Sequence, residues 1–201
     1  ALRVLEALSD RPINVVYVLP DQTFLSPKAK LLEKMTFGIL QEYARSAKIG
    51  KIYLLAQKSL EMIIQDLSFA DYYNKMDEAI ANTFNMVNVL THQSPIFGTY
   101  DETNIQTARI STFGVVDLDK NDECLFFPLE APREKMYMFL VGKKELKSDM
   151  FLMSKIRTFV QNKMSSKIDV SYRVYEAPFD GVRAYCLYSA SMVQQQNVLP
   201  A

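Results

Sequence analysis

One long amphipathic pattern constrains the fold of this chain most. Over residues 68–92, apolar side chains recur three and four positions apart, as they do along one face of an α-helix. These side chains are Phe69, Tyr72, Tyr73, Met76, Ile80, Phe84, Val87 and Leu90. A helix of this length exceeds the globular average, and one with a broad apolar face often lies between two cores. The pattern predicts a central helix with structure packed before and after it.

Before the central helix, two short apolar runs flank another helical pattern. Residues 13–19 and 49–55 are predicted to be buried strands, and residues 28–47 have helical spacing between them. Strand, helix and strand at such short spacing imply parallel strands joined by a right-handed crossover. Residues 1–8 are also expected to be helical, and residues 57–65 are expected to form a connector.

After the central helix the pattern changes to strands. Ser94-Pro95 and Gly98 mark a break, and Asp101 is expected to cap a short helix that extends to Arg109. A second helix is predicted over residues 148–163, with Ser148 and Asp149 as candidate N-caps. The predicted strands are residues 113–118, 124–127, 137–141, 168–175 and 182–188.

The turn Pro178-Phe179-Asp180-Gly181 is expected to join the last two strands as an antiparallel hairpin. The fold class predicted from these patterns is α/β followed by α+β. Residues 1–66 would belong to the first unit, residues 67–93 to the central helix, and residues 94–201 to a sheet of about four strands with helices on one side.

Composition narrows the range of partners. Lys and Arg number 23, as do Asp and Glu, so there is no cationic excess of the kind used for broad nucleic-acid or membrane-surface binding. No apolar run is long enough to predict a membrane span. Cys124 and Cys186 are expected to be buried, reduced thiols, and His92 is expected to be incidental. No metal site is predicted.

The central helix carries one candidate binding pair. Tyr73 and Asp77 are four residues apart and share a helix face. An aromatic ring beside a carboxylate can stack on a purine and accept the N1–H and N2–H hydrogen bonds of guanine, which adenine does not donate. An aromatic core residue beside a solvated aspartate explains the same spacing, and spacing alone favours that simpler explanation.

The second candidate follows the central helix. Tyr100-Asp101-Glu102-Thr103-Asn104 places two acids and an amide at a predicted helix start. Such a loop could orient a water molecule against a phosphate. Helix capping explains Asp101 and Glu102 without any function, and on chemistry alone capping is favoured.

Five segments in order resemble the tubulin/FtsZ family of cytoskeletal GTPases. Residues 13–19 with Phe37-Gly38-Ile39 resemble FtsZ just after its glycine-rich phosphate loop. Residues 52–57, Ile-Tyr-Leu-Leu-Ala-Gln, look like the next strand and its base-facing loop. Residues 69–80 resemble the start of the central helix, where FtsZ has an aromatic and then an Asp-Glu pair, and residues 99–107 are similar to its synergy loop. The resemblance covers nearly the whole chain.

The resemblance implies the second half of a polymerising GTPase: the end of a Rossmann-like domain, the central helix and an activation domain. GTP or GDP with Mg²⁺ would be the cofactors. Gln57, Tyr73 and Asp77 would contact the nucleotide. Asp101, helped by Glu102 and Asn104, would trigger hydrolysis on the adjacent subunit of a head-to-tail homopolymer.

The implied setting is the cytoplasm of a bacterium or a phage-infected host. A DNA-binding adaptor or another filament-associated protein is a further implied partner, with no direct nucleic-acid or membrane contact.

The sequence also departs from the family pattern. Asn104 stands where the family has its second loop acid, and Thr99 and Gln57 replace asparagines. The helix that the family has between the positions of Lys120 and Lys135 is expected to be short or missing. The chain therefore resembles plasmid and bacteriophage tubulins (TubZ, PhuZ) more than housekeeping FtsZ. Two alternatives stay open: a tubulin-like assembly protein that does not hydrolyse GTP, motivated by Asn104, and a small-molecule α/β enzyme.

Overall fold

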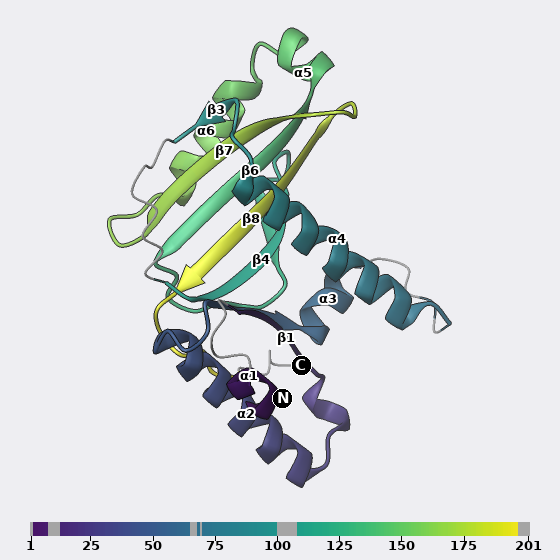
Figure 1. Cartoon of the computed structure of the whole chain (residues 1–201). Helices are drawn as coiled ribbons and strands as arrows, with labels where there is room; N and C mark the ends of the chain where they lie inside the picture. Colours follow the sequence, from purple (N-terminus) through teal and green to yellow (C-terminus); the bar gives the residue numbers. More distant parts are fainter. Residues whose placement is uncertain (1, 8–12, 65–67, 69, 100–107, 197–201) are drawn as a thin grey trace.

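The computed structural model describes residues 2–7, 13–64, 68, 70–99 and 108–196, which fold around one mixed sheet (Figure 1). The helices are α1 (Leu2–Ala7), the 3-10 helix η1 (Gln22–Phe24), α2 (Pro27–Arg45), α3 (Gln57–Ile63), α4 (Tyr72–His92), α5 (Lys143–Ser148) and α6 (Leu152–Lys163). The strands are β1 (Asn14–Leu19), β2 (Lys51–Ala56), β3 (Phe97–Gly98), β4 (Ile110–Asp117), β5 (Asp122–Leu125), β6 (Glu134–Gly142), β7 (Asp169–Ala177) and β8 (Val182–Ala190).

The sheet has the strand order β1-β2-β4-β8-β6-β7-β3, with β5 paired to β4. The predicted parallel pairing of β1 with β2 is confirmed. Strand β4 joins β2 in parallel through two residue pairs, Ile52 with Ile110 and Tyr53 with Ser111. One sheet therefore runs through both units predicted from the sequence, and the division of the chain into domains stays a prediction.

Alternating side chains divide the core between the two faces of this sheet. Along β6, Tyr137 and Phe139 belong to one buried cluster, whereas Met138 and Leu140 belong to the other. The first cluster includes the buried side of α2 and α6, and the second includes α3 and α4. Figure 1 shows α4 running across its face of the sheet from the right side toward β3.

Most predicted elements are present, with ends that differ by a few residues. The central helix α4 starts at Tyr72, after Ser68 and Asp71 have formed a local hydrogen-bonded turn. Helix α2 begins after Ser26, whose hydroxyl accepts a hydrogen bond from the Ala29 amide. No helix lies between Lys120 and Lys135, as predicted.

Strand β1 is not buried on both sides, contrary to the prediction. It is an edge strand, and Val16 and Val18 are exposed while Leu19 is buried. A continuous apolar run cannot distinguish a central strand from an edge strand, because pairing partners lie elsewhere in the sequence.

Two helices, α3 and α5, are absent from the predictions. The connector after β2 is the helix α3, whose apolar side chains Leu60 and Ile63 have helical spacing and pack against the second cluster. The helix predicted over residues 148–163 is present as α6, which begins at Leu152, and the short helix α5 that ends at Ser148 is an element that the sequence did not predict. The Asp149 carboxylate does cap α6, since it accepts hydrogen bonds from the amides of Phe151 and Leu152.

The hairpin predicted between the last two strands is also wrong. Strand β6 lies between β7 and β8, parallel to β7 and antiparallel to β8. The connecting turn passes over the end of β6, where the Gly142 amide donates a hydrogen bond to the Gly181 carbonyl oxygen at 2.9 Å. A Cβ atom at Gly142 would lie 2.4 Å from the Phe179 carbonyl oxygen, so glycine permits this close crossing.

The two cysteines differ in burial. Cys186 is buried as predicted, and burial raises the pKa of its thiol. Cys124 is exposed, contrary to the prediction, because β5 pairs only with β4. His92 is exposed at the end of α4, where its ring nitrogen lies 2.7 Å from the Asn88 carbonyl oxygen. No helix in the described ranges is long and apolar enough to cross a membrane.

Candidate functional site

The carboxyl ends of β1 and β2 lie side by side and form the polar edge where a site is expected. Ligands of open sheets with parallel strands bind outside such carboxyl ends. After β1, Asp21 caps the 3-10 helix η1 by accepting a hydrogen bond from the Thr23 amide at 2.8 Å. That backbone hydrogen bond lowers the pKa of the Asp21 carboxyl. After β2, the chain enters α3 directly at Gln57.

Gln57 links three elements at this edge. Its side-chain oxygen accepts a hydrogen bond from the Asp21 amide at 3.2 Å, and its Nε2 donates one to the Tyr72 hydroxyl at 2.8 Å. The Tyr72 hydroxyl in turn donates to the Glu61 carboxylate. Partial burial and the Glu61 carboxylate raise the pKa of Tyr72. The predicted site residue Gln57 is therefore held at the junction of β1, α3 and α4.

The other two predicted nucleotide contacts lie on the open side of α4. Tyr73 is 75% exposed and packs edge-to-face on Tyr72, with ring centroids 5.1 Å apart. Asp77 is exposed, and its carboxylate accepts no hydrogen bond from other described residues. Tyr73 and Asp77 are thus available to a ligand, and the ring contact with Tyr72 connects Tyr73 to Gln57.

A small cavity of about 60 Å³ lies at the same edge of the sheet. Its lining residues include Asp21, Gln22 and Thr23 from the loop after β1, and Lys58 and Ser59 from the start of α3. The cavity is too small for a nucleotide, since sites for ligands of that size occupy about 300–1,000 Å³. It marks a depression between the two loops.

The second predicted constellation cannot be placed. Asp101, Glu102 and Asn104 lie outside the described residues, as does most of the short helix predicted with them. The residues that flank this segment are held firmly. Thr99 donates its amide to the Tyr172 carbonyl oxygen at 2.9 Å, and Arg109 donates to the Gly50 carbonyl oxygen at 3.1 Å.

Sequence reasoning missed Tyr72 and Glu61 as members of the site. The periodicity assigns Tyr72 to the apolar face of α4, and Glu61 falls in the predicted connector. Glu61 follows Gln57 by four residues, so recognising α3 as a helix would have placed both side chains on one face. No cluster of three metal-ligating side chains occurs in the part of the chain that the structure describes.

Comparison with known proteins identifies the fold through structure alone. No family model and no curated protein sequence matches the chain. A GTPγS-form protofilament of TubZ from Bacillus thuringiensis serovar israelensis matches with a TM-score of 0.66 and 13% identity, over 92% of this chain and 55% of that one. An FtsZ dimer from M. jannaschii matches with a TM-score of 0.56 and 11% identity, over 94% of this chain and 61% of that one.

CetZ from Methanosaeta thermophila matches with a TM-score of 0.63 and 14% identity, over 94% of this chain and 56% of that one. The chain thus spans little more than half the length of each solved structure. The sheet order, the central helix and these matches agree with the fold class predicted from the sequence. The chain has the tubulin/FtsZ fold, in the part that forms the second half of those molecules.

Proposed function

We propose that this chain is part of a GTP-dependent polymerising cytoskeletal protein. Subunits would assemble head to tail into a filament, and the segment that contains Asp101 would trigger GTP hydrolysis on the adjacent subunit. The observation that carries this proposal is the match to TubZ, which includes a protofilament and a four-stranded filament. A head-to-tail contact uses two different surfaces, so it propagates unless it closes into a ring.

The length of α4 supports hydrolysis in trans. Fifteen residues separate Asp77 from His92 at the helix end, a distance of about 22 Å at 1.5 Å per residue. Asp101 follows that end of the helix in sequence. One nucleotide at the Gln57 edge cannot easily contact both ends of α4 in one subunit, so Asp101 is assigned to the nucleotide of a neighbour.

The described residues fit the base of a guanine nucleotide better than its phosphates. The Asp77 carboxylate can accept guanine N1–H and N2–H, Tyr73 can stack on the ring, and Gln57 borders the same edge. The six glycines are at least twelve residues apart, so none of the loops here is a glycine-rich phosphate cradle. The remainder of the full-length protein would hold the phosphates and Mg²⁺, which neutralises charge on the transferring phosphoryl group.

Catalysis would rest on position and charge. A carboxylate at Asp101 would accept a hydrogen bond from the attacking water and orient it, with Glu102 as a helper and Asn104 as a polar orienting group. Phosphoryl transfer depends mainly on such positioning and electrostatics. Because the group comes from the next subunit, hydrolysis would begin only after assembly.

The proposed setting is the bacterial or phage-infected cytoplasm. The filament itself is the main partner, and a DNA-binding adaptor would connect it to cargo, as in plasmid partition; one of the matched structures is that of a type III plasmid segregation TubZ. Asn104 favours a second candidate function, a tubulin-like assembly protein without hydrolysis. Phosphate release that does not rise with protein concentration would favour this second candidate.

Asp101→Ala in the full-length protein separates binding from turnover. We expect GTP binding by the monomer to stay within about twofold of the wild type, and phosphate release to fall by roughly 10²- to 10⁴-fold, as for loss of a group that positions a proton transfer. Filaments of the variant should form and persist. Phosphate release and sedimentation are measured on the same sample.

Asp180→Ala, in the exposed turn between β7 and β8, is the matched control and should behave as the wild type. If Asp101 only caps a helix, its loss costs about 1 kcal/mol of stability and leaves turnover per folded molecule unchanged. Normal turnover in filaments that still disassemble would refute the proposed role of Asp101.

A further inference from the structure

The segment that follows β8 crosses the sheet from one edge to the other. Ala190, the last residue of β8, pairs with Ile110, at the amino ends of β2 and β4. Gln196 lines the cavity at the carboxyl ends of β1 and β2. Six residues span at most about 20–22 Å, and the six residues of β2 already span about 20 Å. Residues 191–196, which we call the strap, are therefore nearly extended.

Gln194 anchors the strap beside α2, where Figure 1 shows this part of the chain in yellow. Its main-chain amide donates to Gln41 Oε1 at 2.7 Å, and its carbonyl oxygen accepts from Gln41 Nε2 at 3.1 Å. The Gln194 side chain pairs in the same reciprocal way with the main chain of Glu130, at 2.7 and 3.3 Å. Gln41 and Gln194 are both buried. Buried hydrogen-bonded amides specify one arrangement, so the strap has a fixed position at this point.

Beyond the anchor, a groove of about 390 Å³ separates the strap from α2. Lys34, Phe37 and Gly38 line the groove on α2, and residues 193–196 line it on the strap. Because of this groove, α2 does not hold the last residue of the strap. The position of Gln196 therefore depends on the anchor and on the cavity that Gln196 lines.

Gln196 brings an unpaired hydrogen-bond donor to that cavity. Its Nε2 is buried and has no hydrogen-bond partner among the described residues. A buried amide without a partner costs free energy, so a partner of another kind is expected. Asp21, Thr23 and Ser59 line the same cavity, whose volume of about 60 Å³ exceeds the roughly 10–15 Å³ that one water molecule needs. A water molecule there would accept from Gln196 and donate to an oxygen atom of the loop after β1.

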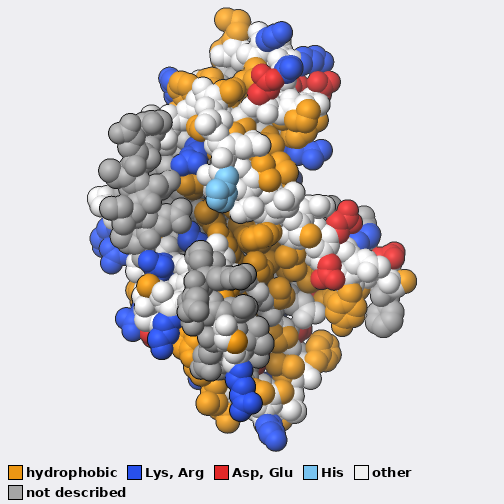
Figure 2. Space-filling view, viewed as in Figure 1, with side chains coloured by type: hydrophobic (Ala, Val, Ile, Leu, Met, Phe, Trp, Pro, Cys, Tyr) orange, Lys and Arg blue, Asp and Glu red, His pale blue; other side chains and the backbone are white. Residues whose placement is uncertain are grey.

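The loop after β1 contacts Gln57, which is proposed to border the guanine base. The Asp21 amide donates to the Gln57 side-chain oxygen at 3.2 Å, and Gln57 Nε2 donates to the Tyr72 hydroxyl at 2.8 Å. Tyr72 begins α4, and Figure 2 shows Asp and Glu side chains over the first turns of this helix, the part that contains Asp77. Water in the cavity would thus complete a chain of contacts from the strap to the residues proposed to hold guanine.

We propose that the strap is a positioning element of the nucleotide site, with Gln194 as its anchor and Gln196 as its positioning residue. Through water in the cavity, Gln196 holds the loop after β1 in the conformation in which the Asp21 amide orients Gln57. This inference rests on the proposed GTP binding and adds a means of controlling it. Displacing the strap weakens GTP binding, and bound GTP in turn stabilises the strap, because such coupling is reciprocal.

Gln196→Ala in the full-length protein tests the positioning role. Below the critical concentration for assembly, we expect the Kd for GTP to rise about three- to tenfold, the effect of one hydrogen bond. In assembled protein the KM for GTP should rise by the same factor, with kcat within about twofold of the wild type, because the group that triggers hydrolysis comes from the next subunit. Thermal unfolding should be unchanged.

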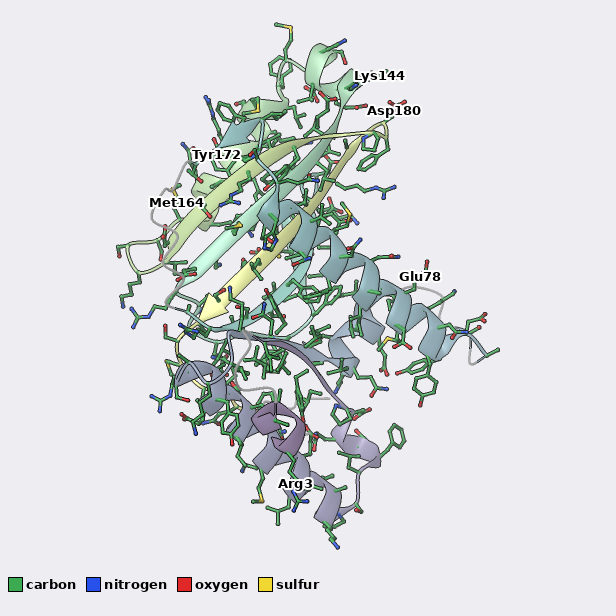
Figure 3. The ribbon with its side chains drawn as sticks, in the orientation of Figure 1. Arg3, Glu78, Lys144, Met164, Tyr172 and Asp180 are labelled. Atoms are coloured by element: carbon green, nitrogen blue, oxygen red, sulfur yellow. The ribbon has the colours of Figure 1, made fainter. Side chains whose placement is uncertain are left out.

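Gln195→Ala is the matched control, because Gln195 is an exposed neighbour of the same type that does not line the cavity. Lys144→Ala is a distant control, since Figure 3 places Lys144 near α5, at the opposite end of the molecule from α2. Both variants should bind GTP as tightly as the wild type.

Breaking the anchor provides a second test. Gln41→Ala removes the side chain that holds Gln194, so it should raise the Kd for GTP by a similar factor. Adding Gln196→Ala should raise the Kd little further, because both changes act through the strap. In the wild type, GTP should slow hydrogen exchange in residues 192–196 together with the loop after β1, an effect that a purely structural strap would not show.

These outcomes separate the two proposals. A wild type that binds no GTP refutes the proposed function. If the wild type binds GTP, the role of the strap alone is refuted by normal affinity in Gln196→Ala, by fully additive losses at Gln41 and Gln196, or by strap exchange that GTP does not alter. If Gln41→Ala does not fold, Gln196→Ala and the exchange measurement decide.

Discussion

At the scale of single residues, the Glu123 carboxylate contacts three polar side chains from three other elements. Its carboxylate accepts hydrogen bonds from the hydroxyls of Tyr137 and Tyr188 and pairs with Lys163 at 3.0 Å. Burial raises the pKa of Glu123, but the hydrogen bonds from Tyr188 and Lys163 outweigh it, so the pKa is lowered overall. These contacts connect β5 to β6, β8 and α6.

This lowered pKa predicts an acid-sensitive contribution to stability. A carboxyl whose pKa is lower in the folded state stabilises the protein above its unfolded pKa of about 4.3, and the contribution is lost as pH falls through the folded pKa. Glu123→Gln should lower the free energy of unfolding by about 1–3 kcal/mol at pH 7 and by less at pH 3. Urea unfolding at several pH values measures this.

Glu176→Gln provides the comparison, because its pair with Lys143 is exposed and contributes little. A loss at Glu123 that is equal at pH 3 and pH 7 would contradict the assignment.

Sequence reasoning at this scale identifies residue types but not their surroundings. The family resemblance predicts Gln57 as a nucleotide contact, and the structure places Gln57 at the carboxyl ends of β1 and β2. Spacing cannot decide between the adjacent Tyr72 and Tyr73, because both fit a broad helix face; the structure puts Tyr72 in the hydrogen-bond network and leaves Tyr73 exposed. Burial of Cys124 is predicted wrongly because pattern alone does not reveal that β5 has one neighbour.

At the scale of elements, the turn over β6 determines the topology of the second half. Strands β7 and β8 are adjacent in sequence, yet β6 lies between them. Gly142 is the point of closest approach: a Cβ there would lie 2.4 Å from both the Phe179 carbonyl oxygen and the Glu145 carboxylate. The side chain of Glu145 can move, but the backbone of the turn is held by the Gly181 contact.

Gly142→Ala should therefore destabilise the protein, by about 1–3 kcal/mol, the usual cost of overpacking. Gly38→Ala is the control, because Gly38 lies in α2 with no atom within 4 Å of the added Cβ. That change should stabilise the protein by roughly 0.5–1 kcal/mol, since alanine favours the helix. Denaturant unfolding of both variants measures the difference. A Gly142→Ala protein as stable as the wild type would show that the turn is free to shift.

Helices and strands are easier to predict from the sequence than the pairing of the strands. Periodicity depends on neighbours along the chain, so α2, α4 and the main strands can be found from the sequence. Strand pairing depends on contacts between distant residues, so the pattern does not reveal the insertion of β6 between β7 and β8. Boundaries are less certain than the elements: the helix predicted from residue 148 begins at Leu152, and the short helix α5 before it is not predicted.

At the scale of the whole molecule, the chain contains the residues proposed to contact the guanine base, Gln57, Tyr73 and Asp77, but no glycine-rich loop for binding phosphates. Titration of these 201 residues with GTP should therefore show no binding in the micromolar range, because phosphate contacts to backbone amides and Mg²⁺ would be missing. Fluorescence or calorimetry with GTP, and with ATP as the comparison nucleotide, measures this. Micromolar affinity for GTP would refute the assignment of phosphate binding to the rest of the full-length protein.

The continuous sheet also bears on how this part of the protein unfolds. Strand β4 is hydrogen-bonded to β2 on one side and to β8 on the other, so the two units predicted from the sequence share one ladder of backbone hydrogen bonds. If either unit opened alone, the backbone groups at the edge of β4 would lose their partners, which costs free energy and favours pairing with another chain. We therefore expect the two units to unfold together, in one transition rather than two.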